Sequence, residues 1–225
     1  MQDQRADLEW REGSIPVSTR FDDPYFSLDN GLAETQHVFL TGNGLPDRYT
    51  DGFHIAELGF GTGLNLLAAL QMWRQSGQRG VLHFTTFEAY PMTAQEMVRA
   101  QKAFPEIAEI AADLAPHWCD DLHRISLPDL EFEMIRGDAR EKLRGWSGQA
   151  DAWFLDGFSP AKNPELWDAD LLREVGRHTV ADGTAATYTA AGFVRRNLQD
   201  AGFEVERISG FGRKRHMTVA RKSPE

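Results

Sequence analysis

Three glycines at alternate positions, Gly59, Gly61 and Gly63, separate two apolar runs in the stretch HIAELGFGTGLNLL. The run before the glycines is typical of a buried strand, and leucines recur at helical spacing over residues 64–73. A strand that ends in glycines and leads into a helix brings backbone N–H groups close to a ligand, because glycine has no Cβ atom. The feature therefore predicts a strand, a tight turn and a helix, with a ligand site at the turn.

Short runs rich in β-forming residues alternate with helical patterns from this stretch to the end of the chain. The runs cover residues 54–58, 82–89, 130–138, 150–158, 183–190, 203–209 and 216–222. Strands separated by helical patterns are typical of βαβ units and a mostly parallel sheet. Only GFGRKR separates the last two runs, which is too short for a helical crossover and predicts an antiparallel hairpin. We expect an α/β, Rossmann-like fold with a mostly parallel seven-stranded sheet and an antiparallel last strand.

Some helix ends carry recognisable signals. Thr93 followed by Glu96 matches a capping box at the start of a helix. Asn163 and Pro164 fit the N-cap and first position of a helix that continues through ELWDADLLREVGRH. A final helix is expected over residues 189–202.

The first part of the chain differs from the rest. Residues 1–50 lack helical periodicity, and STRFDDPYFSLDNG within them is typical of turns and short strands. We expect an N-terminal extension of residues 1–50, folded over the sheet edge or the site, and a catalytic domain of residues 51–225. The two are expected to form one structural unit.

The composition argues against several classes of protein. A lone cysteine, Cys119, excludes an internal disulfide, and the seven histidines show no metal-ligand spacing, so no metal is expected. Neither a signal peptide nor an apolar run of about 18 residues is present, so we expect no membrane span and a soluble, cytoplasmic protein. The net charge of −10 argues against indiscriminate nucleic-acid binding but allows a local basic patch, such as that within residues 207–222.

Acidic residues fall where the predicted strands end. Glu57 precedes the first glycine by two residues, and Glu88, Asp138 and Asp156 end the runs that follow. The carboxyl ends of parallel strands share one edge of the sheet, so these side chains are expected to converge beside the glycine turn. The glycines read G-x-G-x-G, with Leu64 at the place of the third glycine of the dinucleotide fingerprint, so the spacing departs from that of NAD enzymes. Carboxylates there suit ribose hydroxyls, an adenine amino group and the positive charges of S-adenosylmethionine.

Each of these features also has a structural interpretation. A single acid at a strand end is more often a helix cap or a solvated turn residue than a ligand contact. The glycine turn alone could serve close helix packing. The four acids together favour the ligand interpretation.

The segment FLDGFSPAKNPELW follows a buried run and is a candidate for the chemical centre. If the acceptor is an amine, Asp156 could hold its ammonium group and assist loss of the proton. Lys162 could meet a phosphate, and Phe158 and Trp167 could stack on a base. The alternative for Trp167 is a buried position on a helix face.

Five blocks of the chain resemble one known family in order and over nearly the whole length. They are VSTRFDDPYFSLDNGLAET, AELGFGTGLN, DAWFLDGFSPAKNPELW, AGFVRRNL and GFGRKRHM. These blocks resemble the methyltransferase domain of the tRNA 5-methylaminomethyl-2-thiouridine biosynthesis bifunctional proteins, the MnmC family. The resemblance implies methyl transfer from S-adenosylmethionine to the aminomethyl group of the wobble uridine of certain tRNAs.

The resemblance also implies roles for individual residues. Cofactor binding is expected at Glu57, Gly59, Phe60, Gly61, Gly63, Asn65, Glu88, Asp138 and Asp156. Asp156 would also face the substrate amine as the catalytic residue. Contacts with tRNA or the substrate pocket are expected at Lys162, Asn163 and the loop containing Phe211, Arg213, Lys214 and Arg215.

The chain departs from that family in length. The bifunctional proteins continue into an FAD-dependent oxidase domain, whereas this sequence ends at Glu225 without a second glycine fingerprint. We therefore expect a stand-alone methyltransferase or an isolated domain. Either a separate enzyme supplies the aminomethyl precursor, or the physiological route differs. Because the net charge is negative, tRNA binding is expected to need a basic strip, formed by Lys162, Arg195, Arg196 and the loop of residues 213–215.

Three other functions stay open at this point. The first is a methyltransferase that acts on another amine, in a small molecule or a protein. The second is a nicotinamide-dependent oxidoreductase, which the glycine spacing disfavours. The third is a non-enzymatic RNA-binding module, which would leave the acids and glycines without a role.

Overall fold

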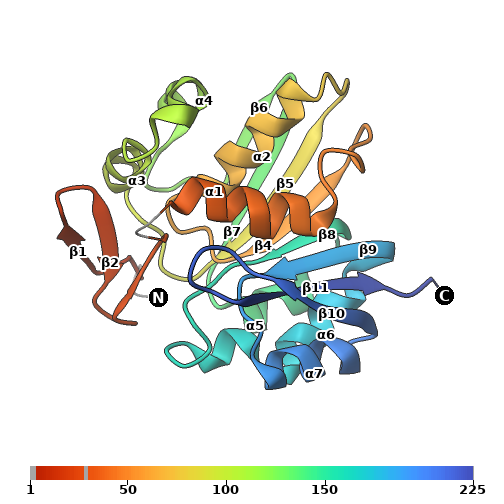
Figure 1. Ribbon diagram of the computed structural model, residues 1–225. Helices are drawn as coiled ribbons and strands as arrows, with labels where there is room; N and C mark the ends of the chain where they lie inside the picture. The colour runs from red at the N-terminus through yellow and green to blue at the C-terminus, as the bar shows by residue number, and fades with distance from the viewer. Residues whose placement is uncertain (1–3, 28–29, 225) are drawn as a thin grey trace.

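A computed structural model describes residues 4–27 and 30–224 of the chain (Figure 1). Its main sheet is formed by β4 (His54–Leu58), β5 (Leu82–Glu88), β6 (Arg124–Leu127), β7 (Leu130–Arg136), β8 (Ala150–Leu155), β9 (Thr179–Thr187), β10 (Phe203–Ser209) and β11 (His216–Lys222). Among the described residues this sheet has eight strands, in the order β10-β11-β9-β8-β4-β5-β7-β6. Neighbouring strands from β9 through β8, β4 and β5 to β7 pair in parallel.

The two antiparallel parts of the sheet lie at its edges. Strand β11 is antiparallel to both β9 and β10, which confirms the predicted hairpin and the antiparallel last strand. Strand β6 pairs antiparallel with β7 at the other edge, so the prediction of seven strands was one too few. Strand β6 has only four residues and a two-residue turn joins it to β7, which left too little pattern to detect it.

Helices cover both faces of the sheet. They are α1 (Gly31–Thr35), α2 (Leu64–Gln75), α3 (Ala94–Gln101), α4 (Ala108–Leu114), α5 (Ala139–Lys142), α6 (Ala169–Arg177) and α7 (Gly192–Asp200). Figure 1 shows α1 to α4 on one side of the sheet and α5, α6 and α7 on the other. Alternate residues of β4 face the two sides, because Ile55 belongs to one buried cluster and Ala56 and Leu58 to the other. The result is a three-layer α/β fold.

The predicted helix start at Thr93 is confirmed, whereas Asn163 and Pro164 start only a short 3₁₀ turn and not the long helix that was predicted. Thr93 and Glu96 form the capping box of α3, in which the Thr93 N–H donates to Glu96 Oε2 at 2.8 Å. Residues Pro164–Trp167 instead form a separate 3₁₀ turn, and Asp168 caps α6 by accepting from Leu171 N at 2.8 Å. The extended backbone of Asp168 prevents one continuous helix from Asn163.

The N-terminal region contains more helix than its sequence indicated. Strands β1 (Leu8–Arg11), β2 (Ile15–Ser18) and β3 (Asp23–Pro24) form a small separate sheet, and β3 lies within the stretch that was predicted to contain turns and short strands. Residues 31–43 then form α1, a π-helical turn and a 3₁₀ turn, so the expected lack of helix was wrong there. These three pieces have different numbers of residues per turn, so their apolar residues do not repeat at the 3.6-residue spacing of an α-helix. The division at residue 50 remains a prediction.

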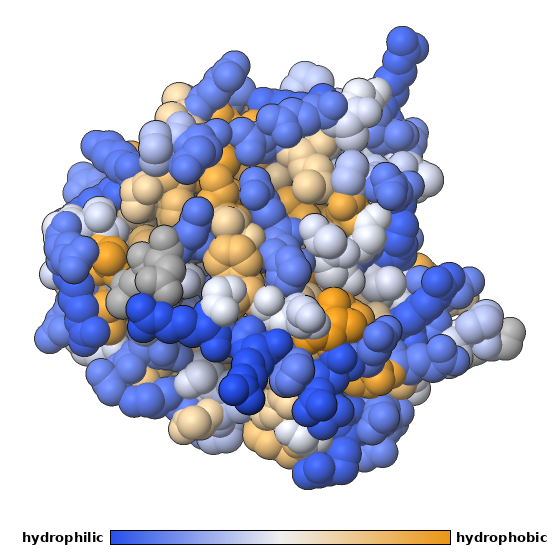
Figure 2. All heavy atoms as spheres, viewed as in Figure 1, coloured by the Kyte–Doolittle hydropathy of each residue, from blue (hydrophilic) through white to orange (hydrophobic). Residues whose placement is uncertain are grey.

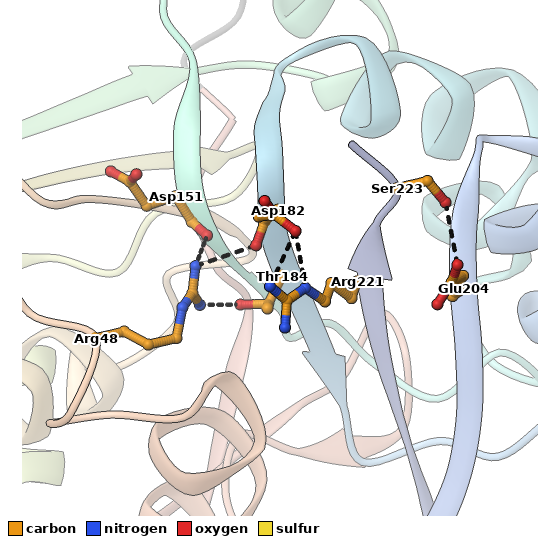
Figure 3. Close-up of polar contacts among 7 residues, drawn as sticks. All are labelled: Arg48, Asp151, Asp182, Thr184, Glu204, Arg221 and Ser223. Carbon is orange, nitrogen blue, oxygen red and sulfur yellow. Dashed lines mark hydrogen bonds and ion pairs between the residues drawn. The ribbon is translucent and has the colours of Figure 1, made fainter. Parts of the chain in front are cut away.

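Arg48 connects the N-terminal region to the main sheet through hydrogen bonds (Figure 3). Its guanidinium donates to the carbonyl of Asn43 at 2.9 Å, to Thr184 Oγ1 of β9 at 2.5 Å and to the carbonyl of Asp151 of β8 at 3.1 Å. Burial lowers the pKa of Arg48 from its ordinary value. The segment before β4 is thus held against the strands that carry the site.

The surface viewed in Figure 2 is mostly hydrophilic, with small groups of apolar residues between the polar ones. Among the described residues, Phe193 is the one large hydrophobic side chain that is exposed. No helix within residues 4–27 and 30–224 is long and apolar enough to cross a membrane. The same residues contain no cluster of three or more His, Cys, Asp or Glu side chains that could hold a metal ion.

Candidate active site

A cavity of about 1170 Å³ lies at the carboxyl edge of the parallel strands. The glycine turn after β4 and the segments that follow β5, β7 and β8 form its floor and walls. The N-terminal segment of residues 20–27 and Lys214 of the β10–β11 hairpin complete it. The predicted convergence of strand ends at one site is therefore present.

The glycine turn is shaped by the segment after β8. Gly59 has a φ of +88°, and a Cβ atom there would lie 2.1 Å from the carbonyl oxygen of Asp156. Gly61 has a φ of +53°, and its Cβ would lie 3.0 Å from the Tyr25 ring. Only glycine fits this backbone without strain, and its backbone atoms stay open to the cavity.

Glu88 fixes the same turn from the end of β5. Its Oε2 accepts from the N–H groups of Phe60 at 2.9 Å and Gly61 at 3.1 Å, and its Oε1 accepts from Tyr90 N at 2.7 Å. A carboxylate oxygen has capacity for a second hydrogen bond. Glu88 lines the cavity, and its predicted contact with ribose hydroxyls remains a prediction.

Asp138 lies at the end of β7 and lines the cavity as well. It caps α5 by accepting from Arg140 N at 2.9 Å and pairs with the Arg140 guanidinium at 2.6 Å. The Arg140 hydrogen bond lowers the pKa of Asp138, which keeps it ionised. Asp138 is thus a helix cap, as the structural interpretation of a strand-end acid predicted. It also lines the cavity, where it can still accept a hydrogen bond from a ligand.

Asp156 follows β8 and is the acid most affected by its surroundings. Burial raises the pKa of Asp156 to about 7, and the Glu34 carboxylate contributes in the same direction. Opposing them, Asn65 Nδ2 donates to Asp156 Oδ2 at 2.7 Å, and the Lys214 ammonium also favours the ionised form. A carboxyl group that changes its charge near neutral pH in a cavity is suited to proton transfer.

Asn65 joins Asp156 to a second buried carboxyl group. Its amide donates also to Glu57 Oε1 at 2.9 Å, and its Oδ1 accepts from Thr35 Oγ1 at 3.0 Å. Glu57 is fully buried, does not line the cavity and accepts a further hydrogen bond from Thr86 Oγ1 at 2.8 Å. Glu57 therefore orients Asn65 from the protein interior. A direct contact of Glu57 with the cofactor remains a prediction.

Glu57 is expected to be protonated in the folded protein, because burial raises its pKa well above the ordinary value of 4.5. The unfolded chain releases this proton above about pH 4.5 and the folded chain retains it, so Glu57 lowers stability as pH rises through that window. Glu57→Gln keeps an acceptor for Asn65 and a partner for Thr86 without the proton. The free energy of unfolding of Glu57→Gln, measured relative to that of wild type, is expected to be higher at pH 8 than at pH 5. Urea unfolding at both pH values measures this, and an unchanged difference would contradict it.

Comparison with known proteins decides the family. The model of a family described as S-adenosyl-L-methionine-dependent methyltransferase matches residues 105–223, more than half of the chain. The chain belongs to this methyltransferase family. Its cofactor is S-adenosylmethionine, and the cavity fits that molecule in its volume, its glycine turn without Cβ atoms and the three acids at its strand ends, Glu88, Asp138 and Asp156.

Curated relatives of the methyltransferase carry one shared name. Proteins called tRNA 5-methylaminomethyl-2-thiouridine biosynthesis bifunctional protein MnmC are 46% identical in Caulobacter sp. (strain K31) and 43% identical in Hahella chejuensis. Each match covers 95% of this chain but only 38% and 36% of the relatives, so the chain spans little more than a third of their length.

Solved structures agree with the fold. The crystal structure of MNMC2 from Aquifex aeolicus has a TM-score of 0.79 and 26% identity, over 99% of this chain and 72% of that chain. A methyltransferase from Pyrococcus furiosus, with a TM-score of 0.51 and 14% identity over 97% of this chain and 89% of that one, shares the fold alone. The Rossmann-like methyltransferase fold is thereby confirmed.

Two of the predicted substrate residues in the segment after β8 line the cavity. They are Phe158 and Asn163. The Phe158 ring stacks on Phe21 at 4.6 Å between centroids and meets Tyr25 edge-on at 4.9 Å. The aromatic wall next to Asp156 is thus shared with the N-terminal segment.

Lys162 and Trp167 do not line the cavity. The predicted contact of Lys162 with a phosphate remains a prediction. Lys162 forms an exposed ion pair with Asp22 at 2.7 Å. Trp167 is 1% exposed and donates from Nε1 to the carbonyl of Phe158 at 3.0 Å. The indole is a buried residue that supports the Phe158 loop, which was the alternative weighed for it.

The β10–β11 hairpin brings one of its four predicted residues into the cavity, namely Lys214. Phe211 is half-buried, with its ring centroid 6.0 Å from that of His37, and Arg213 and Arg215 are exposed at the tip. These three positions flank the cavity without lining it. Their contacts with tRNA remain predictions.

Sequence reasoning missed several residues that line the cavity of the methyltransferase. They are Arg20, Phe21, Tyr25, Glu34 and Tyr188. Arg20 packs its guanidinium 4.4 Å from the centre of the Tyr90 ring. The three aromatic residues of RFDDPYF, which fit neither a helical nor a strand period, were the available signal for this segment. Glu34 lies in VSTRFDDPYFSLDNGLAET, one of the blocks that resemble the MnmC family, whereas no local signal marked Tyr188.

Proposed function

We propose that the methyltransferase transfers a methyl group from S-adenosylmethionine to 5-aminomethyl-(2-thio)uridine at the wobble position of tRNA. The product is 5-methylaminomethyl-(2-thio)uridine. The name shared by the curated relatives supports this substrate. The observation that carries the proposal is Asp156, a cavity carboxyl group whose pKa is raised to about 7 beside the glycine turn.

An amine acceptor needs a proton acceptor, because an alkylammonium has no free lone pair. S-adenosylmethionine supplies an electrophilic methyl group, and the chain must supply a neutral amine in line with it. Taking about 10.4 for an alkylammonium, a carboxyl pKa of about 7 instead of about 3.8 lowers the cost of proton transfer from about 9 to about 5 kcal/mol. Asp156 thus both attracts the ammonium and accepts its proton more readily than an ordinary aspartate.

Recognition of tRNA requires positive charge near the cavity mouth. Arg213 and Arg215 are exposed beside Lys214, and we assign them to phosphate contacts whose affinity falls as salt rises. Lys162 is already paired with Asp22 and contributes less to the proposed strip. Arg195 and Arg196 lie on α7, and their place in the basic strip remains a prediction. Cytoplasmic location belongs to the same proposal.

Methyl transfer from labelled S-adenosylmethionine into tRNA bearing 5-aminomethyl-2-thiouridine tests the proposal. Nucleoside mass analysis is expected to show one added methyl group on that nucleoside. The same tRNA with unmodified wobble uridine is the control and is expected to stay unlabelled. Cofactor binding without label in either tRNA would reject tRNA as the substrate and favour another amine, in a small molecule or a protein.

A further inference from the structure

A positively charged group of the chain itself lies in the cavity, next to Asp156. The Lys214 ammonium, on the tip of the β10–β11 hairpin, is 2.7 Å from Glu34 Oε1. The same nitrogen is 4.1 Å from the centre of the Tyr188 ring. A carboxylate and an aromatic face together are the groups that proteins use to bind organic ammonium ions.

Glu34 is held firmly at this place. Its side chain is only 12% exposed, on a helix whose N-cap, Asn30, accepts from Ala33 N. The next residue, Thr35, donates to Asn65 at 3.0 Å, and Asn65 donates to Asp156 at 2.7 Å. Helix α1 therefore fixes the distance between the Glu34 and Asp156 carboxyl groups.

Tyr188 is fixed to the same region by its hydroxyl. That hydroxyl donates to the carbonyl of Gly157 at 2.6 Å, directly after Asp156. Burial raises the pKa of Tyr188, and the charges of Asp156, Asp23 and Glu34 act in the same direction. The charges of three acids thus act on this ring, and Lys214 pairs with one of them, Glu34.

Lys214, in contrast, is held loosely. Its side chain is 45% exposed, and its stem has four rotatable carbons. An ion pair that is open to water on one side contributes little to stability. The lysine can therefore swing out of the cavity while Glu34 and Tyr188 keep their positions.

We propose that Glu34 and the ring of Tyr188 form an alkylammonium-binding subsite beside Asp156, which Lys214 occupies until the substrate amine displaces it. The inference rests on the proposed function, since it takes a primary amine as the acceptor. The side chain of Lys214 ends in the same chemical group as an aminomethyl substituent. Glu34 then selects the charged amine, and Asp156 receives its proton.

Binding of n-propylammonium to the full chain tests the subsite without tRNA. Lys214→Met removes the competing ammonium but keeps the length of the stem. A tethered competitor acts at millimolar or higher effective concentration, so this variant is expected to bind the probe about tenfold more tightly than wild type. Neutral n-propanol is the control ligand and is expected to show no such gain.

Further variants identify the partners. Glu34→Gln added to Lys214→Met is expected to abolish the gain in n-propylammonium affinity, because the glutamine amide has the shape of the glutamate side chain but not its negative charge. In the Lys214→Met background, Tyr188→Phe keeps the ring and is expected to keep binding, whereas Tyr188→Leu is expected to lose it. Thermal unfolding and S-adenosylmethionine affinity show whether each variant is folded. Equal affinity of wild type and Lys214→Met for the probe, or a gain that survives Glu34→Gln, would overturn the subsite.

A second measurement links the subsite to the substrate. Wild type is expected to bind tRNA with aminomethyluridine more tightly than the same tRNA without it, and Glu34→Gln to reduce this preference about tenfold. An unchanged preference would overturn the role of Glu34 in recognition. Label transfer into tRNA without any binding of propylammonium to Lys214→Met would reject the subsite alone. Binding of the probe without label transfer would reject only tRNA as the substrate.

Discussion

Asparagine in place of Asp156 is expected to lower the turnover number by about 10²- to 10⁴-fold, the usual contribution of a general base. Asparagine keeps the size of the side chain and can still accept the hydrogen bond from Asn65. It cannot accept a proton from the substrate ammonium, and it does not attract that ammonium. S-adenosylmethionine affinity is expected to change much less than turnover. Single-turnover methyl transfer with a separate measurement of cofactor binding distinguishes the two.

The pH dependence provides an independent check on the same residue. The ionised form of Asp156 accepts the proton, so the rate of wild type is expected to rise as pH passes through about 7. The hydrogen bond from Asn65 lowers this pKa, so Asn65→Ala is expected to move the rise to higher pH.

Asp151 offers a matched control for Asp156 on the same strand. It accepts from His54 N at 2.8 Å at the other end of β8, outside the cavity. Asp151→Asn is expected to retain turnover near that of wild type. Unchanged turnover in Asp156→Asn, or an equal loss in both variants, would remove Asp156 from the mechanism.

The parts of the fold that follow from local sequence were predictable. The glycine turn and the leucines after it define β4 and α2, since both depend on residues close in the chain. The capping box of Thr93 and Glu96 is equally local. Strand β6 and the short helical turns over residues 31–43 were missed, because each has too few residues to show a periodic pattern of its own.

The site was predictable only where topology alone decides it. Parallel strands bring Glu88, Asp138 and Asp156 to one edge whatever packs around them. The direction of each side chain depends on packing. Glu57 is therefore buried in the interior, whereas Asp156 lines the cavity. The pairing of Glu34 with Lys214 joins positions 180 residues apart, so no spacing rule could reveal it.

Gly59→Ala is expected to have the largest effect on stability of any methyl-sized change at the site. The added Cβ would lie 2.1 Å from the carbonyl oxygen of Asp156, with the backbone at a φ of +88°. Left-handed strain costs about 1–3 kcal/mol and a forced shift of packed backbone about 1–3 kcal/mol more, so the free energy of unfolding is expected to fall by about 2–6 kcal/mol. Urea unfolding measures this loss.

Gly52→Ala separates the two contributions to that loss. Gly52 has a similar φ of +77°, but a Cβ atom there would have no neighbour within 4 Å. It is expected to show the backbone strain alone, with turnover and S-adenosylmethionine affinity close to wild type. In Gly59→Ala the clash can be relieved only by moving the glycine turn or the backbone of Asp156, so cofactor affinity and turnover must fall as well. Equal stability losses in the two variants, with activity retained in both, would show that the close approach of Gly59 to Asp156 does not shape the site.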